Sequence, residues 1–297
     1  MNRVKEQICC RDAHTLGVTG KGIGVAVLDT GIFLHKDFDD RIVGFADFVN
    51  RRSVPYDDCG HGSHICGIIG GSGLASDGRY QGMAPECHLL MVKVLDRKGN
   101  GSVPQVLAGI EWILERKEIF GIRILNISVG SGEKRNISEN SALVRGVNRA
   151  WDAGLVVVVA AGNNGPKRMS VTTPGISRKV ITVGCSDDDR EVLVGEKRLV
   201  DDSGRGPTRE CVCKPDLGAP GSCVVSCAAD GNRYAIKSGT SMSTPVVSGA
   251  IALLLEKFPN MTNRDVKLKL RETCFDLGFP KNQQGWGMLN VERMLQG

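Results

Sequence analysis

The chain has 297 residues, of which 41% are hydrophobic and 24% charged, with a formal net charge of +5. These values are ordinary for a globular protein with a large core. The apolar runs are far shorter than a membrane span, and no apolar signal segment follows the first residues, so we expect neither a transmembrane helix nor a signal peptide. Lys and Arg do not cluster with aromatic residues, so we expect no nucleic-acid partner.

Short apolar runs typical of buried strands alternate with segments of helical periodicity along the chain. Strands are predicted at 23–28, 88–95, 122–127, 155–160 and 180–183, and helices at 61–71, from Ser102 to about Gly121, at 139–153, near 262–272 and near 290–296. Residues 32–60 are interpreted as polar loops. This alternation predicts an α/β fold: a doubly wound, mostly parallel sheet with helices on both faces.

Polar residues follow three of the predicted strands directly. Asp29, Ser128 and Asn163 each come just after such a run. The carboxyl ends of parallel strands meet at one rim of the sheet, which is where open α/β sheets bind ligands. Each residue alone is more often a turn residue, but together they predict a polar site at this rim.

A second polar stretch opens a helix that we expect to be buried nearly all round. Ser241 precedes the uncharged run 246–255, and Thr240 is interpreted as the helix N-cap. The free N–H groups of this first turn would face an oxyanion formed at Ser241. A serine at this position is usually only a cap, so the partners elsewhere in the chain decide its function.

A serine hydroxyl becomes an acyl-transfer nucleophile only beside a base, a carboxylate that orients the base, and donors for the oxyanion. His61 supplies a candidate base, Asp29 a carboxylate and Asn163 a donor. The chain order Asp29, His61, Ser241 is the order found in subtilisin and differs from those of chymotrypsin and the α/β-hydrolases. The sequence therefore predicts a serine hydrolase.

The motifs around these residues resemble those of the subtilisin-like serine proteases. The resemblance rests on the stretches 29–31, 61–64 and 239–245, and extends over about residues 15–294 through 82–85, 92–95, 126–130, 160–163 and 219–221. Within the family, 76–82 and 203–208 look most like the bacterial cytoplasmic subtilisins. The resemblance divides the chain into an N-terminal extension, 1–14, and a peptidase domain, 15–297.

The resemblance implies a serine endopeptidase that works through an acyl-enzyme on Ser241. His61 would act as general base and acid, Asp29 would orient His61, and Asn163 would stand in the oxyanion hole. An extended peptide would pair with both walls of the cleft. The implied substrate-binding residues are Gly99, Asn100, Gly101, Ser128, Val129, Gly130, Ala160, Ala161 and Gly162, with Thr172 and Thr173 near the pocket floor. No acid lines this pocket, which favours apolar side chains over Lys or Arg.

The chain departs from the family pattern in three places. The folding-assisting propeptide is not seen ahead of residue 15, which implies unaided folding or an incomplete sequence. Asp37 stands where the family often has a calcium ligand, but 72–81 is unlike the calcium loop of the secreted enzymes. Calcium binding at Asp37 is therefore possible, and no cofactor is expected to be required. The segment 186–205 is unusually acidic.

The eleven cysteines show no disulfide-scaffold spacing, so we expect them to be reduced and the protein to be cytoplasmic. The stretch from Cys59 through His61 and His64 to Cys66 matches no common zinc spacing. Two alternatives stay open: a regulatory pseudoprotease that binds peptides without cutting them, and a thiol-rich metal or redox protein. We expect polypeptide substrates and no membrane partner.

Overall fold

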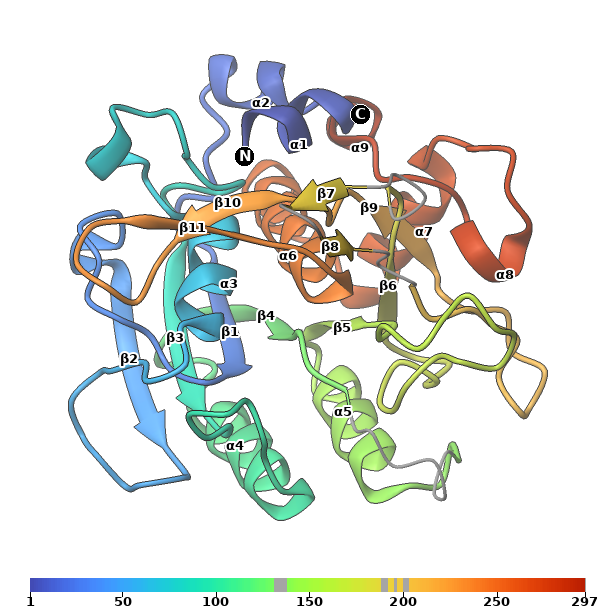
Figure 1. The fold of residues 1–297 in the computed structure, drawn as a ribbon, viewed down its shortest axis with the longest axis horizontal. Coiled ribbons are helices and arrows are strands. Elements are labelled where there is room, and N and C mark those ends of the chain that lie inside the picture. Colours follow the sequence, from blue (N-terminus) through green and yellow to red (C-terminus); the bar gives the residue numbers. More distant parts are fainter. Residues whose placement is uncertain (131–137, 188–191, 195–196, 200–202, 297) are drawn as a thin grey trace.

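A parallel seven-stranded sheet runs through the centre of the protein in a computed structural model that describes residues 1–130, 138–187, 192–194, 197–199 and 203–296 (Figure 1). The strand order is β2-β3-β1-β4-β5-β6-β9, and every neighbouring pair is parallel. The strands are β1 (Gly24–Asp29), β2 (Ile42–Asp47), β3 (His88–Lys93), β4 (Ile122–Ile127), β5 (Val156–Ala160), β6 (Ile181–Cys185) and β9 (Leu217–Ala219).

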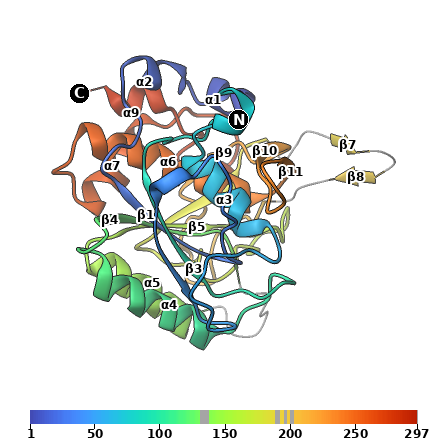
Figure 2. The ribbon, with the colours of Figure 1, turned by 90° about the vertical axis from the view of Figure 1, so that its left-hand side faces the viewer.

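Helices cover both faces of this sheet, which confirms the predicted fold class. Figure 2 shows α4 (Val103–Arg116) and α5 (Ala142–Asp152) on one face, and α3 (His61–Gly70) and α6 (Thr240–Lys257) on the other. The central strands β1 and β5 are buried along their whole length because both of their faces are covered. Ser102 caps α4, as predicted, with a capping box to Gln105.

Smaller elements surround this layered core. An antiparallel hairpin packs against α3, and the N-terminal helices lie beside the last helix of the chain (Figure 1). These elements are β10 (Val224–Cys227), β11 (Tyr234–Lys237), β7 (Val192–Val194), β8 (Lys197–Leu199), α1 (Asn2–Gln7), α2 (Arg11–Thr15), α7 (Asn263–Thr273), α8 (Lys281–Gln284), α9 (Val291–Leu295) and the 3₁₀ turns Asp39–Arg41 and Leu74–Ser76. Part of the acidic segment 186–205 lies outside the described residues.

Two predictions about local structure were wrong. Residues 42–47 form the edge strand β2 and not a loop; all six are half-buried, so the strand lacks a clear buried or alternating signature. Thr240 is the first residue of α6 and not its N-cap, because Gly239 occupies that position.

The site lies where the strand order reverses. From β1 the chain builds β2 and β3 on one side, then crosses to β4, β5, β6 and β9 on the other. Asp29 ends β1 and Ser128 follows β4, the two strands that flank this switch point. Open α/β sheets bind ligands at such a point, so the topology itself puts the predicted rim residues around one crevice.

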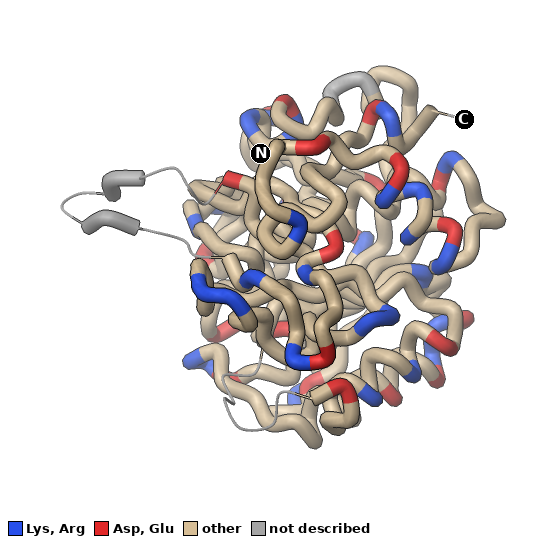
Figure 3. Tube along the Cα trace, turned by 90° about the vertical axis from the view of Figure 1, so that its right-hand side faces the viewer, with Lys and Arg blue, Asp and Glu red and all other residues tan. Residues whose placement is uncertain are grey.

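Acidic and basic residues are intermixed along the outer segments, as Figure 3 shows. None of the helices within the described ranges combines the length and apolar character that a membrane span requires.

Candidate active site

Asp29 and His61 form a hydrogen-bonded pair at the carboxyl end of β1. Asp29 is fully buried at the end of that strand, and His61 is the first residue of α3. His61 Nδ1 lies 2.7 Å from Asp29 Oδ1, which also accepts the Thr30 N–H at 2.7 Å. A carboxylate can only accept here, so Nδ1 carries the hydrogen and the lone pair is on Nε2, the nitrogen that can take a proton.

The environment of His61 raises its pKa above the ordinary value of 6.5. Burial alone lowers this pKa, but the charge of Asp29 and its hydrogen bond to the ring outweigh the effect of burial. Lys237 lowers the pKa and Asp57 raises it by smaller amounts. The imidazole is thus a stronger base than a free histidine.

A second carboxylate, Asp57, holds the first turn of α3 against the loop after β1. Its Oδ1 accepts the Thr30 hydroxyl at 2.9 Å and the Gly60 N–H at 2.8 Å, and its Oδ2 accepts the N–H and the hydroxyl of Ser63 at 2.9 and 2.7 Å. The Thr30 hydroxyl in turn accepts the Gly62 N–H at 2.9 Å. Sequence reasoning missed Asp57, whose one signal was its place shortly before His61.

The buried Lys93, at the end of β3, ties the same two loops together. Its Nζ donates to the Thr30 carbonyl oxygen, to Asp58 Oδ1 at 2.7 Å and to the Leu95 carbonyl oxygen at 2.9 Å. A lone buried ammonium is costly, and these three oxygens compensate for that cost while fixing the positions of the loops.

Ser241 lies on the same rim, in the first turn of α6. Its hydroxyl donates a hydrogen bond of 2.6 Å to the Ser128 carbonyl oxygen, just past β4. The described hydrogen bonds include none between Ser241 and His61.

Asn163 is held in one orientation by Thr240. Its Oδ1 accepts the Thr240 N–H at 3.1 Å and the Thr240 hydroxyl at 2.8 Å. Because both Thr240 groups donate, the Asn163 atom that faces them must be the oxygen Oδ1. The amide hydrogens on Nδ2 are then left for another acceptor. Gly239 has φ of +133°, and a Cβ there would lie 3.1 Å from Asn163 Nδ2. Glycine is therefore required where the chain turns into α6.

A cavity of about 250 Å³ opens beside Ser241 and Asn163. Its lining carries no charged side chain. A Cβ at Gly162 would lie 2.4 Å from Thr172 Oγ1, so this glycine lets Thr172 pack against the wall. The lining residues are Gly99, Ser128, Val129, Gly130, Ala160, Gly162, Asn163, Asn164, Thr172, Thr240 and Ser241.

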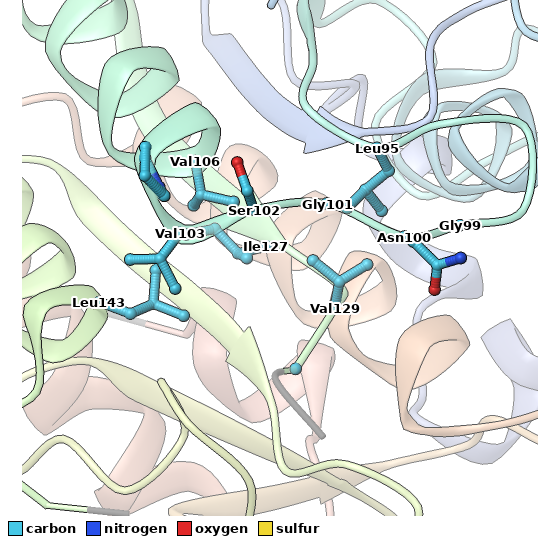
Figure 4. Close-up of a pocket in the computed structure, with 12 residues that line it drawn as sticks. Leu95, Gly99, Asn100, Gly101, Ser102, Val103, Val106, Ile127, Val129 and Leu143 are labelled. Carbon is cyan, nitrogen blue, oxygen red and sulfur yellow. The ribbon is translucent and has the colours of Figure 1, made fainter. Parts of the chain in front are cut away.

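A larger cavity of about 470 Å³ continues the cleft between the loop before α4 and the end of β4. Figure 4 shows aliphatic side chains from both sides lining it. Gly99, Val129 and Gly130 line both cavities. The lining residues are Leu95, Gly99, Asn100, Gly101, Ser102, Val103, Pro104, Val106, Ile127, Val129, Gly130 and Leu143.

Eight of the nine residues expected to bind substrate line one or both cavities. Ala161 lines neither: it is buried, and its carbonyl oxygen accepts the Thr172 N–H at 2.9 Å. It thus acts on the pocket wall through its backbone. Thr173 is also buried and lines neither cavity.

Hydrogen-bond donors surround the carboxylate of Asp37. Its Oδ1 accepts the Ala75 N–H at 2.8 Å, and its Oδ2 accepts the Tyr234 hydroxyl at 2.8 Å and the Cys227 thiol at 3.6 Å. Burial, and after it Asp37, raises the pKa of Cys227 well above its usual value, so the thiol keeps its proton. His35, Asp37 and Cys227 place ligand atoms within 4.8 Å of one another. Calcium needs converging oxygens, which these donors do not provide, so the residues present do not fit that ion.

The candidate cysteine and histidine site near α3 does not come together as a metal cluster in the described part of the chain. His64 is buried, and its Nε2 lies 3.1 Å from the carbonyl oxygens of Val224 and Ala235 in the β10–β11 hairpin. Burial, followed by Lys237, lowers the pKa of His64 to about 3. His64 is a neutral structural residue, while Cys59 is exposed and Cys66 is buried.

The doubly wound sheet brings the hydrogen-bonded Asp29 and His61 to the same rim as Ser241 and Asn163, which line an uncharged cleft. These are the groups that acyl transfer from a serine requires, so the fold and site define a serine hydrolase. Residues 20–287 match the subtilase family, and the chain belongs to that family.

The relatives agree with this placement. Serine protease AprX of Bacillus subtilis is 40% identical over 97% of this chain and 69% of its own length. Subtilisin Savinase of Lederbergia lenta is 35% identical over 94% and 93%. Among solved structures, Sphericase superposes with a TM-score of 0.77 at 29% identity over 92% of each chain. A cold adapted subtilisin-like serine proteinase has a TM-score of 0.73 at 29% identity, covering 92% of this chain and 90% of its own. The protein is a subtilisin-type serine endopeptidase, and its substrates are polypeptides.

Proposed function

We propose that the chain cleaves peptide bonds through an acyl-enzyme on Ser241. His61 takes the hydroxyl proton of Ser241 as general base and later delivers it to the leaving amine as general acid. Asp29 holds the Nδ1–H tautomer of His61 and stabilises the imidazolium that forms. The 2.7 Å contact between His61 Nδ1 and Asp29 Oδ1 carries this proposal, because it leaves the Nε2 lone pair as the base.

Asn163 donates a side-chain N–H to the tetrahedral oxyanion, together with the N–H of Ser241. This proposal is supported by the two bonds from Thr240, which aim Oδ1 away from the reacting carbonyl and leave Nδ2 as the donor. A donor fixed before the reaction needs no reorganisation when charge develops, which is why such groups contribute strongly to catalysis.

The substrate lies extended between Gly99–Gly101 and Ser128–Gly130 as an added strand. The cavity of about 250 Å³ takes the side chain before the scissile bond, and its uncharged lining favours apolar side chains. The larger cavity takes a side chain further towards the substrate's N-terminus, and its aliphatic lining favours the same class.

The enzyme requires no cofactor and works in the cytoplasm in this proposal. The absence of a required metal is supported by Asp37, whose two carboxylate oxygens already accept hydrogen bonds from the protein. The free thiols of the exposed Cys9, Cys59, Cys211 and Cys213 support the cytoplasmic location, because a reducing compartment keeps accessible thiols in this state.

The test is incubation with a fluorophosphonate probe, followed by mass spectrometry of the adduct. We expect the label on Ser241, and loss of both labelling and peptide cleavage in Ser241→Ala. Ser243→Ala, two residues further along α6, is the matched control and should label normally. Cleavage that persists in Ser241→Ala would rule out the proposed nucleophile. A labelled but non-cleaving wild type would support the peptide-binding alternative, which no observation here favours.

A further inference from the structure

The N-terminal helix α1 makes a part-buried polar contact with Asp187, just after β6, and with Ser222, just before β10. Arg3 Nη1 lies 2.6 Å from Asp187 Oδ2, and Arg3 Nη2 donates to the Ser222 carbonyl oxygen. Arg3 Nη1 also donates to Gln7 Oε1 at 2.9 Å within α1. The Asp187 side chain is 5% exposed and that of Arg3 39%, so the arginine reaches inward from the surface to a buried acceptor.

Asp187 passes this contact to the backbone of residues 221–222. Its Oδ1 accepts the N–H groups of Gly221 and Ser222 at 2.8 and 3.0 Å, and its carbonyl oxygen accepts the Ser222 hydroxyl at 3.0 Å. The Cys185 thiol also donates to Oδ1, at 3.2 Å. Oδ1 of Asp187 thus binds mainly backbone N–H groups, while Oδ2 binds Arg3.

Residue 221 in turn supports the segment that carries the nucleophile. The Gly221 carbonyl oxygen accepts the Gly239 N–H at 3.1 Å. A Cβ at Gly221 would lie 2.3 Å from Ser243 Oγ and 2.6 Å from the Gly239 carbonyl oxygen, so the two segments are in direct contact. Gly239 also packs against Asn163 Nδ2. A displacement of residues 221–222 would thus reach both the start of α6 and the oxyanion donor.

The helix that carries Arg3 is itself anchored in the body of the protein. Met1, Val4 and Ile8 are buried in the main hydrophobic core. The Ile8 carbonyl oxygen accepts the Val291 N–H at 2.8 Å at the start of α9, and Lys5 Nζ donates to Gln81 at 3.2 Å. Arg3 therefore has a fixed support from which to hold Asp187.

We propose that Arg3 is a positioning residue for the nucleophile, acting through Asp187 and residues 221–222 on Gly239 and Ser241. This inference rests on the proposed role of Ser241. A guanidinium suits the position because its planar fork reaches the carboxylate and the Ser222 carbonyl together, which a lysine ammonium cannot do in the same geometry. In this proposal the N-terminal helix α1 contributes to kcat by holding the nucleophile in position.

Arg3→Ala should lower kcat and leave KM nearly unchanged. Neither cavity proposed to bind substrate is lined by residues 221–222, and of the segment 239–243 only Thr240 and Ser241 line one of them. A displacement of 1 Å in a catalytic group costs about 100-fold, so a partial shift should cost about tenfold in kcat. The rate of fluorophosphonate labelling at Ser241 should fall by the same factor, and Arg3→Lys should recover part of both.

Two controls separate positioning from general weakening of the fold. Lys5→Ala removes a contact of the same helix that does not involve Asp187, and should lower the melting temperature without lowering kcat. Arg149→Ala removes an ion-paired surface arginine on α5 and should change neither. Asp187→Asn keeps the side-chain shape but removes the charge, and should resemble Arg3→Ala even if the latter folds poorly.

Equal kcat in wild type and in folded Arg3→Ala, or a kcat loss in Lys5→Ala as large as in Arg3→Ala, would overturn this inference. Full activity in Asp187→Asn would overturn it as well. A failure of the proposed function looks different, because the wild type itself would then neither label on Ser241 nor cleave peptides.

Discussion

The Ser241 hydroxyl donates to the Ser128 carbonyl oxygen at 2.6 Å, although this carbonyl lies on the wall expected to pair with substrate. The residue before the scissile bond would offer its own N–H to the same oxygen. Substrate binding would then release the Ser241 hydroxyl to turn towards His61. Both hydrogen bonds would use one acceptor oxygen, so we expect the substrate N–H to weaken the bond from Ser241 and to favour activation of the nucleophile.

A peptide N-methylated at that amide should therefore be a poorer substrate. One lost hydrogen bond is worth about 0.5–1.5 kcal/mol, which corresponds to a loss of about 2–10-fold in kcat/KM. Steady-state kinetics on paired chromogenic peptides measure this effect. Methylation of an amide outside the cleft is the control, and an equal loss there would contradict the special role of Ser128.

The raised pKa of His61 determines the acid limb of the pH profile. His61 must be neutral to accept a proton, so kcat/KM should fall as the pH drops through a pKa above 6.5. In Asp29→Asn the main influence that raises this pKa is lost while burial remains. The inflection should then move below 6.5, and kcat should fall by about 10⁴-fold as the tautomer is lost. An unmoved inflection would show that another group controls the limb.

Asn163→Ala should lower kcat by about 10²–10³-fold with little change in KM, a range that itself comes from removing one oxyanion donor in a subtilisin. Thr240→Val tests how the amide is aimed. It removes the hydroxyl that binds Asn163 Oδ1 but keeps the backbone bond, so the loss should be smaller than in Asn163→Ala. Initial rates on one peptide series compare the two variants. A larger loss in Thr240→Val would assign the threonine a separate role.

Peptides with Phe or Leu before the scissile bond should exceed those with Arg in kcat/KM. The cavity of about 250 Å³ lacks a charged side chain, so no opposite charge in it compensates for removing a guanidinium from water. Asn164, exposed on the rim, offers an isosteric test. Asn164→Asp should raise the Arg-to-Phe ratio by no more than about fivefold, since exposed ion pairs contribute about 0.2–1 kcal/mol. A wild-type preference for Arg would contradict the pocket assignment.

Calcium and EDTA should leave the melting temperature almost unchanged. Asp37 already has protein donors on both oxygens, so any calcium site there is weak. At a calcium concentration equal to Kd, binding contributes about 0.4 kcal/mol, or about 1 °C in this size range. Scanning calorimetry with about 1 mM calcium, or with about 1 mM EDTA, measures the shift in melting temperature. A rise of many degrees that Asp37→Asn abolishes would contradict this.

Much of the fold and of the site could be predicted because both rest on local signals. The runs at 23–28 and 155–160 are apolar and β-branched, and each ends in a polar turn at the rim. Parallel strands then require Asp29, Ser128 and Asn163 to meet at one edge, whatever the loops between them do. The half-buried edge strand β2 offered no such signal.

Contacts between segments far apart in the sequence could not be predicted in this way. Arg3 and Asp187 are 184 positions apart, and neither lies in a motif that points to the other. Thr240 looked like a helix cap because its type suits one, but its hydroxyl instead binds Asn163. The hydrogen-bond partner of a hydroxyl depends on which groups lie near it in the folded chain, and local sequence patterns do not give this information.

Helix α6 begins beside the cleft and continues as one of the most deeply buried segments of the protein, with every residue from Met242 to Leu255 buried. Its amides should therefore exchange with solvent only when the whole domain opens. A protease in solution can be cleaved by other copies of itself, and this autolytic cleavage begins at exposed loops. Cleavage in such loops leaves α6, which carries Ser241, folded in place. Autolysis should therefore divide the chain into fragments well before it abolishes the activity.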